Sequence, residues 1–429
     1  MGSARVLQLL KRYESRNVTF IEEDGSWPIV WRQARGCHVR DEEGRRYLDL
    51  TAAFGVAAAG HANPAVVKAG QRQMGRLLHA MGDVHPHALK AGLARELSRL
   101  TFERWGVGEG RTLFCSSGFE AIEAALKTAL LATGRPGILS FQGAYHGLGY
   151  GALNATHRPH FRSPFRRQLR SFARFLPYPV AGDPRGLETL QTSLERAAAR
   201  SPVGAVLVEP VQARGGIRVP PAGFLQIVRD WCHRHGALLV TDEIYTGFGR
   251  TGAWFASEHE KVAPDLICLG KALAGGFPIS ACVGESRVMK AAWPRSSGEA
   301  LHTSTFLGHP VGCAMALAQI GEIRRLGLVD RSRDLGEKLL GWLRALGPST
   351  GRLALEARGA GLMAGIELRT RRGKPATAAS LRAVKQMLCR GYILLPEGEA
   401  SNVIGFTPPL TVGDRALRNS VTALGESLL

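Results

Sequence analysis

One lysine lies between glycines at the end of a short apolar run, a position that suits a chemical role. Lys271 follows the run Leu266 to Leu269 in the sequence Gly270-Lys271-Ala-Leu-Ala-Gly-Gly. Lysines and arginines total 55, but only ten are lysines, so arginine fills most surface positions. A lysine here is therefore a candidate for chemistry that arginine cannot do, namely losing a proton and forming an imine with a carbonyl group. A solvated surface lysine is the alternative, and it is the commoner case for this residue type.

Two other predicted strand ends carry groups suited to a planar, anionic cofactor. Ser117-Gly118-Phe119 follows an apolar run and opens a helical pattern, so its free N–H groups could bind a phosphate. The same residues could equally be an ordinary helix cap. After the next run come Tyr145 and His146, beside glycines. The aromatic ring could stack on a planar cofactor, or it could belong to the core.

Carboxylates end two further apolar runs. Glu209 follows Ala205 to Val208, and Asp242 follows Ala237 to Thr241. A carboxylate in such a place is costly unless it meets a cation or a metal. No histidine and cysteine cluster completes a metal site, so we expect no metal and favour a cationic ring nitrogen as the partner. An ion pair with Arg250 is the alternative.

The elements that must position these groups alternate along the middle of the chain. From residue 111 onward, short apolar runs alternate with helical patterns, which predicts an α/β fold with a mainly parallel sheet and helices on both faces. We expect three parts. Residues 1–64 form an N-terminal segment with an antiparallel ribbon that joins the small domain, 65–310 form the large cofactor-binding domain, and 311–429 form a smaller α+β domain.

Bulk composition restricts the partners. The chain has 429 residues, is 45% hydrophobic and carries a net charge of +19. The positive charge is spread along the chain without a lysine-rich tail, so we expect no nucleic-acid partner. Its densest cluster, 158–174, is interpreted as a partly packed loop, with an entrance for acidic substrates as the alternative.

Targeting signals are also missing from the sequence. No run of 18 uncharged apolar residues occurs, and the N-terminal residues are too polar for a signal peptide, so we expect no membrane partner. Seven cysteines without a CxxC pair suggest core residues in a reducing compartment, and we expect the cytoplasm.

The order of these motifs resembles that of the class III (ω-amino acid type) pyridoxal-phosphate (PLP) aminotransferases. The resemblance covers nearly the whole chain and implies fold type I, PLP as the cofactor, and a homodimer with active sites at the subunit interface. It rests on Ser117-Gly118-Phe119-Glu-Ala, Tyr145-His146-Gly147, Glu209-Pro-Val-Gln212, Asp242-Glu-Ile244, Gly270-Lys271 and Ser304-Thr305-Phe306.

The resemblance also implies roles for single residues. Lys271 would hold the cofactor as an imine and shuttle the proton, while Asp242 would pair with the ring nitrogen. Backbone N–H groups of Gly118 and Phe119 would bind the phosphate, helped by Thr305 from the partner subunit. Tyr145 and Ile244 would lie on the two faces of the cofactor ring, and Tyr245 would either lie near the ring hydroxyl group or only pack beside the site. The expected cofactor site comprises Ser117, Gly118, Phe119, Tyr145, His146, Glu209, Asp242, Ile244, Tyr245, Lys271 and Thr305.

Two departures from the family concern the substrate. Many members have a glutamate two residues after the glutamine of Glu-Pro-x-Gln and an arginine just before the C-terminal Pro-Pro, and that glutamate neutralises the carboxylate-binding arginine for ω-amino donors. Here the two positions hold Arg214 and Gly405. Our hypothesis is that Arg214 binds the substrate carboxylate, with a solvent-facing loop residue as the alternative. Phe54 is expected to line the substrate pocket.

The resemblance implies transfer of an amino group from an amino acid or ω-amine donor to a 2-oxo acid such as pyruvate or 2-oxoglutarate, in two half-reactions. A PLP-dependent racemase or aminomutase of the same fold is the alternative, because it would use the same proton step at Lys271. The two differ in whether the donor alone releases a free 2-oxo acid.

Overall fold

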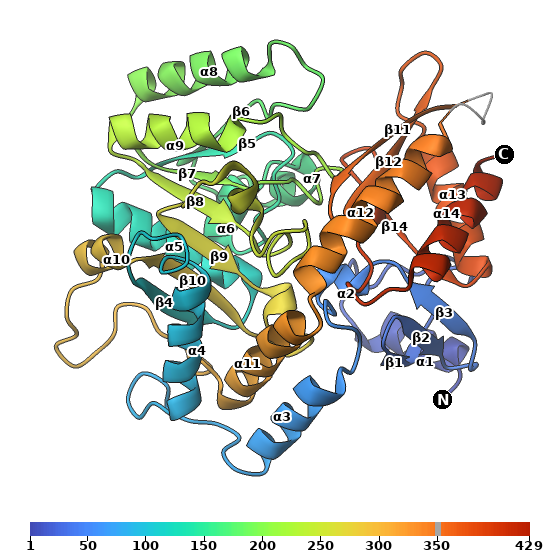
Figure 1. The fold of residues 1–429 in the computed structure, drawn as a ribbon, viewed down its shortest axis with the longest axis horizontal. Coiled ribbons are helices and arrows are strands. Elements are labelled where there is room, and N and C mark those ends of the chain that lie inside the picture. The colour runs from blue at the N-terminus through green and yellow to red at the C-terminus, as the bar shows by residue number, and fades with distance from the viewer. Residues whose placement is uncertain (348–352) are drawn as a thin grey trace.

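A seven-stranded sheet forms the centre of the computed structural model, which describes residues 1–347 and 353–429. Its strand order is β4-β10-β9-β8-β7-β5-β6 (Figure 1). The strands are β4 (Gly110–Cys115), β5 (Gly137–Phe141), β6 (Ala173–Leu176), β7 (Val203–Val208), β8 (Leu238–Asp242), β9 (Leu266–Leu269) and β10 (Ser280–Glu285). Strands β5 to β9 pair in parallel, and β10 runs antiparallel to both β4 and β9. The predicted mainly parallel sheet is confirmed.

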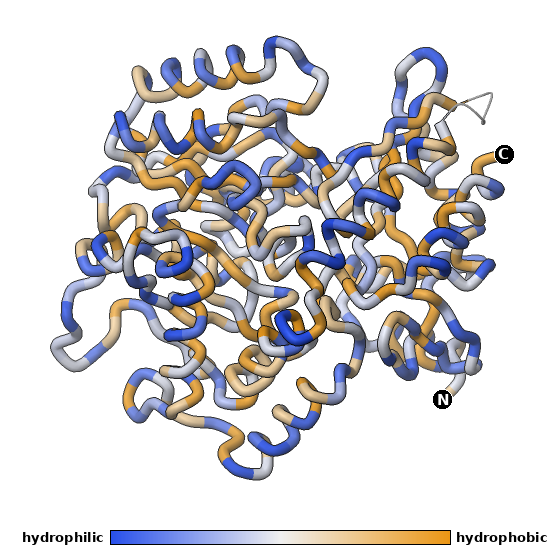
Figure 2. Tube along the Cα trace, in the orientation of Figure 1, coloured by the Kyte–Doolittle hydropathy of each residue, from blue (hydrophilic) through white to orange (hydrophobic). Residues whose placement is uncertain are grey.

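Both faces of this sheet are buried, which explains why its strands are apolar runs. Strand β7 is buried along its whole length. Ala205 and Leu207 pack into one core with α5 (Gly118–Thr133), and Val206 and Val208 pack into another core with α8 (Gly186–Arg200) and α9 (Phe224–His235). Figure 2 shows hydrophobic and hydrophilic residues alternating along α8, as expected for a helix that covers a sheet.

The remaining helices lie beside the large sheet or in the N- and C-terminal parts of the chain. Helix α11 packs against α3 and α4 beside the large sheet, and α12 leads from there to the C-terminal part (Figure 1). Their bounds are α1 (Ser3–Tyr13), α2 (Ala52–Gly55), α3 (Pro64–Met74), α4 (Ala88–Leu100), α6 (Tyr150–Ala155), α7 (Pro159–Arg162), α10 (Ser286–Ala292), α11 (Pro310–Arg325), α12 (Leu328–Ala345), α13 (Thr377–Cys389) and α14 (Asp414–Leu428). Across the two described ranges, no helix is long and apolar enough to cross a bilayer.

Two smaller sheets lie at the other end of the molecule. The predicted N-terminal ribbon is present, and its first strand begins at Trp31. It joins the C-terminal part because β13 pairs in parallel with β3. The strands are β1 (Trp31–Arg35), β2 (His38–Asp41), β3 (Arg46–Asp49) and β13 (Tyr392–Ile393) in one sheet, and β11 (Leu353–Ala360), β12 (Met363–Thr370), β15 (Val403–Phe406) and β14 (Leu395–Glu397) in the other.

Candidate active site

Lys271 lies at the carboxyl end of β9, where it begins the 3-10 turn η3 (Lys271–Leu273). Its Nζ is 3.6 Å from the centroid of the Tyr245 ring. Burial lowers the pKa of Lys271 to about 8, against the opposing effect of the carboxylates of Asp242, Glu209 and Glu397. An amine with this pKa is partly neutral near physiological pH and can act as a nucleophile or a base.

Asp242, the last residue of β8, faces the same cavity and is held in place at both oxygens. His146 Nδ1 donates a hydrogen bond to Asp242 Oδ2 (2.8 Å), and the Ile244 N–H donates to Oδ1 (3.1 Å). The Asp242 and His146 side chains are both buried. In the described parts of the chain, the buried His146 Nε2 has no hydrogen-bond partner. The Asp242 carboxylate is therefore fixed in position, and Nε2 of the adjacent His146 ring is unpaired.

Glu209 uses its carboxylate to join two loops. Its oxygens accept hydrogen bonds from the N–H groups of Tyr145 (2.9 Å) and Ala213 (3.3 Å). Burial raises the pKa of Glu209 and the nearby Asp242 carboxylate adds to the rise, against the opposing effect of His146 and the two N–H groups. This buried carboxylate places the Tyr145 ring and the start of the loop that carries Arg214 on the same side of the sheet.

The start of α5 forms a polar cradle next to these groups. Glu120 Oε2 accepts hydrogen bonds from the N–H groups of Ser116 (2.7 Å) and Ser117 (2.8 Å). The N–H groups of Gly118 and Phe119 lie in the first turn of the helix and therefore have no helical partners. Ser117 and Glu120 form a capping box at this helix start. A Cβ on Gly118 would lie 3.1 Å from Ile244 Cδ1, so the glycine lets the start of α5 pack closely against Ile244.

Two adjoining cavities collect most of the predicted residues. The inner one, about 420 Å³, is lined by Gly118, Phe119, Tyr145, His146, Glu209, Arg214, Asp242, Ile244, Tyr245 and Lys271. Phe54 lines the outer one, about 690 Å³, which shares Tyr145, Arg214, Tyr245 and Lys271 with the inner cavity. Ser117 lies beside the cradle just described. Thr305 is exposed and lines neither of these two cavities.

Arg214 lines both cavities and lies next to Glu397, a residue that the sequence motifs did not indicate. Its Nη1 lies 3.4 Å from Oε2 of Glu397, at the end of β14, and its Cζ lies 5.8 Å from the Tyr145 ring centroid. Burial raises the pKa of Glu397 to about 7. No sequence signal marked Glu397, because β14 is a three-residue strand without an apolar pattern. Arg158, from the basic segment, also lines the outer cavity.

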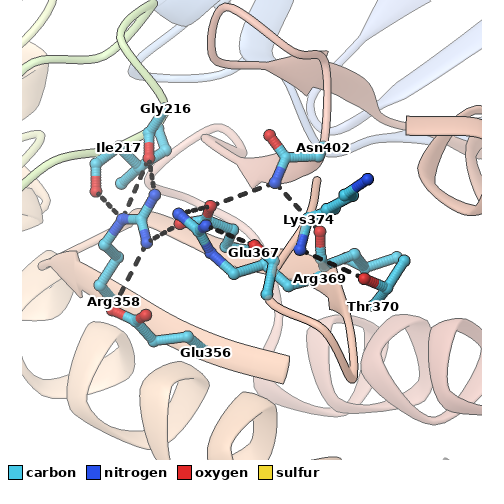
Figure 3. A network of polar contacts seen from close by, with 11 residues as sticks. Gly216, Ile217, Glu356, Arg358, Glu367, Arg369, Thr370, Lys374 and Asn402 are labelled. Carbon is cyan, nitrogen blue, oxygen red and sulfur yellow. Dashed lines mark hydrogen bonds and ion pairs between the residues drawn. The ribbon is translucent and has the colours of Figure 1, made fainter. Parts of the chain in front are cut away.

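A polar network fixes the loop after Arg214 to the C-terminal sheet, as Figure 3 shows. Arg358 of β11 donates to the carbonyl oxygens of Gly216 (2.8 and 3.1 Å) and Ile217 (3.0 Å). It also pairs with Glu367 of β12 (2.5 Å). Strand β14, which ends at Glu397, belongs to the same sheet as β11 and β12. The network therefore holds the loop after Arg214 in a fixed position relative to Glu397.

A lysine and an aspartate at neighbouring strand ends, beside an anion-binding helix start, define the class of fold type I PLP-dependent enzymes. The chain belongs to the class III aminotransferases, because the model of the family "Aminotransferase class-III" matches residues 20–428. It is a PLP-dependent aminotransferase that transfers an amino group from a donor to a 2-oxo acid.

Relatives with known names agree with this assignment. The chain is 34% identical to the acetylornithine aminotransferase of Methanosarcina acetivorans, over 94% of this chain and 92% of that protein. It is also 34% identical to the 5-aminovalerate aminotransferase of Pseudomonas aeruginosa, over 93% of each. Among solved structures, it resembles the ornithine aminotransferase of Toxoplasma gondii (TM-score 0.86, 26% identity, 100% and 95% coverage). A PLP-bound amine transaminase from an uncultivated Pseudomonas species is also similar (TM-score 0.86, 28% identity, 97% and 98% coverage).

Proposed function

We propose that the residues of the inner cavity hold PLP and that Lys271 is the catalytic base. The residues of the cavity fit this cofactor. The first-turn N–H groups of Gly118 and Phe119 suit a phosphate, and the buried Asp242 suits a cationic ring nitrogen. When bound, PLP supplies a carbonyl carbon that accepts the amino group and a ring that withdraws electrons from the substrate.

In this proposal the protein's residues bind, orient and move protons. Lys271 Nζ would hold the cofactor covalently and, once released, would take up the proton from the donor carbon that carries the amino group. Asp242, oriented by His146, keeps the ring nitrogen protonated. Tyr145 and Ile244 enclose the ring, and Tyr245, whose hydroxyl is paired with Thr407 (3.0 Å), lines the side where Lys271 lies.

Arg214 is proposed to bind the substrate carboxylate, in the position where relatives carry a glutamate. The supporting observation is that Arg214 lines both cavities together with Lys271 and has Glu397 within ion-pair distance. The relatives' names point to donors that carry an ω-amino group and a carboxylate, such as 5-aminovalerate. The acceptor is proposed to be pyruvate or 2-oxoglutarate.

Kinetics of Arg214→Ala test this substrate assignment. Loss of a charged hydrogen bond costs about 1.5–3 kcal/mol, so KM for 5-aminovalerate should rise about 10- to 150-fold, while KM for an amine without a carboxylate, such as 1-aminopropane, stays within about twofold. Arg166→Ala, at an exposed position of the basic segment, is the matched control for charge and should change neither. Equal effects on both donors would refute the role of Arg214.

A homodimer with shared sites is also proposed, because Thr305 is exposed and reaches neither cavity of its own chain. Mixing Lys271→Ala and Thr305→Asp chains tests it. If Thr305 serves the partner's phosphate site, the mixed dimer contains one intact site and regains part of the activity. No regain, with mixed dimers demonstrated, would place Thr305 outside the partner's site.

We further propose the division into 1–64, 65–310 and 311–429 and a cytoplasmic location. The pairing of β13 with β3 supports joining the N-terminal segment to the C-terminal part. The seven free cysteines suit a reducing compartment. Cell fractionation tests the location, and hydrogen exchange, which should show the N-terminal ribbon and 311–429 opening together, tests the division.

A further inference from the structure

The ion pair between Arg214 and Glu397 gives a buried carboxylate few contacts, and its partner Arg214 has 28% of its side chain exposed. Glu397 has 6% of its side chain exposed, and its Oε2, 3.4 Å from Arg214 Nη1, accepts no hydrogen bond from the described residues. A buried carboxylate with a single long contact loses more hydration than the contact returns. Glu397 is therefore poised to change partner or charge.

The position of Glu397 depends on Gly405. Strand β14 pairs with β15, with Leu395 opposite Gly405. A Cβ on Gly405 would lie 3.1 Å from Glu397 Cγ, so the absence of a side chain there leaves room for Glu397. Arg214 and Gly405, the two departures from the family pattern, therefore both contact Glu397 in this structure.

We propose that Glu397 controls carboxylate binding at Arg214 by taking up a proton when a substrate carboxylate displaces it. This inference rests on the proposed role of Arg214. Two carboxylates facing one guanidinium in a buried pocket repel each other, and the protonation of one removes that repulsion. The proposed ω-amino acid donor and the 2-oxo acid both carry a carboxylate, so Glu397 is neutral while either is bound at Arg214 and ionised when no carboxylate is bound there.

The charged groups around Glu397 make this exchange possible near neutral pH. Burial raises its pKa to about 7, and Arg214, Lys271 and Arg158 oppose that rise. Tyr245 faces it from the loop after β8. A substrate carboxylate at Arg214 weakens the most important of these opposing charges, so the pKa of Glu397 must rise further on binding.

Calorimetry of the PLP-loaded enzyme tests the proposal with valerate, a carboxylate that has no amino or oxo group and cannot react. Titrations at pH 8 in two buffers of different ionisation enthalpy measure the protons taken up on binding. We expect uptake approaching one proton per site, and a Kd that rises toward tenfold per pH unit above the pKa of Glu397. Valeramide, the neutral analogue, should bind without proton uptake.

The variants separate this inference from the proposed function. Glu397→Gln should bind valerate more tightly than wild type at pH 8, without proton uptake and with a Kd independent of pH between about 6.5 and 8.5. Arg214→Ala should lose valerate binding. If Arg214→Ala loses binding but wild-type enzyme takes up no proton, the role of Glu397 is refuted and that of Arg214 stands. If Arg214→Ala binds valerate normally, both fail. Unchanged proton uptake in Glu397→Gln would assign the proton to another group and refute the inference.

Discussion

The lowered pKa of Lys271 predicts how fast the cofactor-free protein captures PLP as the pH changes. Only the neutral amine attacks a carbonyl carbon. With a pKa of about 8, roughly one quarter of Lys271 is neutral at pH 7.5, whereas a lysine with the ordinary value of 10.5 would be about one thousandth neutral. Lys271 should therefore react about 200-fold faster at this pH than its ordinary pKa would allow.

Stopped-flow absorbance measures this capture rate between about pH 6.5 and 10. The rate should rise about tenfold per pH unit below pH 8 and level off above it, because burial has already shifted the titration. Nα-acetyl-lysine under the same conditions corrects for protonation of PLP itself. Asp242→Asn removes the carboxylate that most raises the pKa of Lys271, so its midpoint should lie at lower pH. A corrected rate that still climbs beyond pH 9.5 would refute the account of a buried, readily deprotonated lysine.

Two substitutions test the framework of the site. Gly55 has φ +80°, and a Cβ there would lie 2.3 Å from Tyr245 Cε2, so Gly55→Ala should lower the free energy of unfolding in urea by about 2–4 kcal/mol. Gly106→Ala, at φ +74° with open space around it, should cost only about 1 kcal/mol, and equal losses would contradict the packing argument. Arg250 is buried and donates to the carbonyl oxygens of Leu362 (2.9 Å) and Pro408 (2.6 Å), so Arg250→Leu should cost about 3 kcal/mol by leaving both unpaired. Arg287→Leu, with 79% of the side chain exposed, is the control and should change stability by less than about 0.5 kcal/mol.

Apolar runs predicted most of the large sheet because its strands are buried on both faces. Strand β9 has the predicted bounds, and β7 and β8 agree within two residues. Strand β10 was missed because Ser-Ala-Cys-Val-Gly-Glu has little apolar bulk. Its Gly284 packs closely on Leu266, where a Cβ would be 2.4 Å from Cδ2, so small residues are required there. Strand β6, with an arginine in four residues, lies at the sheet edge and lacks a continuous apolar signal.

The candidate site was predictable where one residue type at a strand end carried the chemistry. Lys271, Asp242 and Glu209 are of this kind. Glu397 was not, since β14 is a three-residue strand without an apolar pattern. Its importance follows only from its contact with Arg214, which lies 183 positions earlier in the chain. Contacts between distant segments, such as the network of Arg358, leave no local pattern to find.

The most direct test of the central claim is to locate the covalent bond to the cofactor. Borohydride reduction of the PLP-loaded enzyme, followed by proteolysis and mass spectrometry, should place the pyridoxyl group on Lys271 alone among the ten lysines. Lys271→Ala treated in the same way should carry no label. A label on another lysine in the active wild-type enzyme would contradict the account.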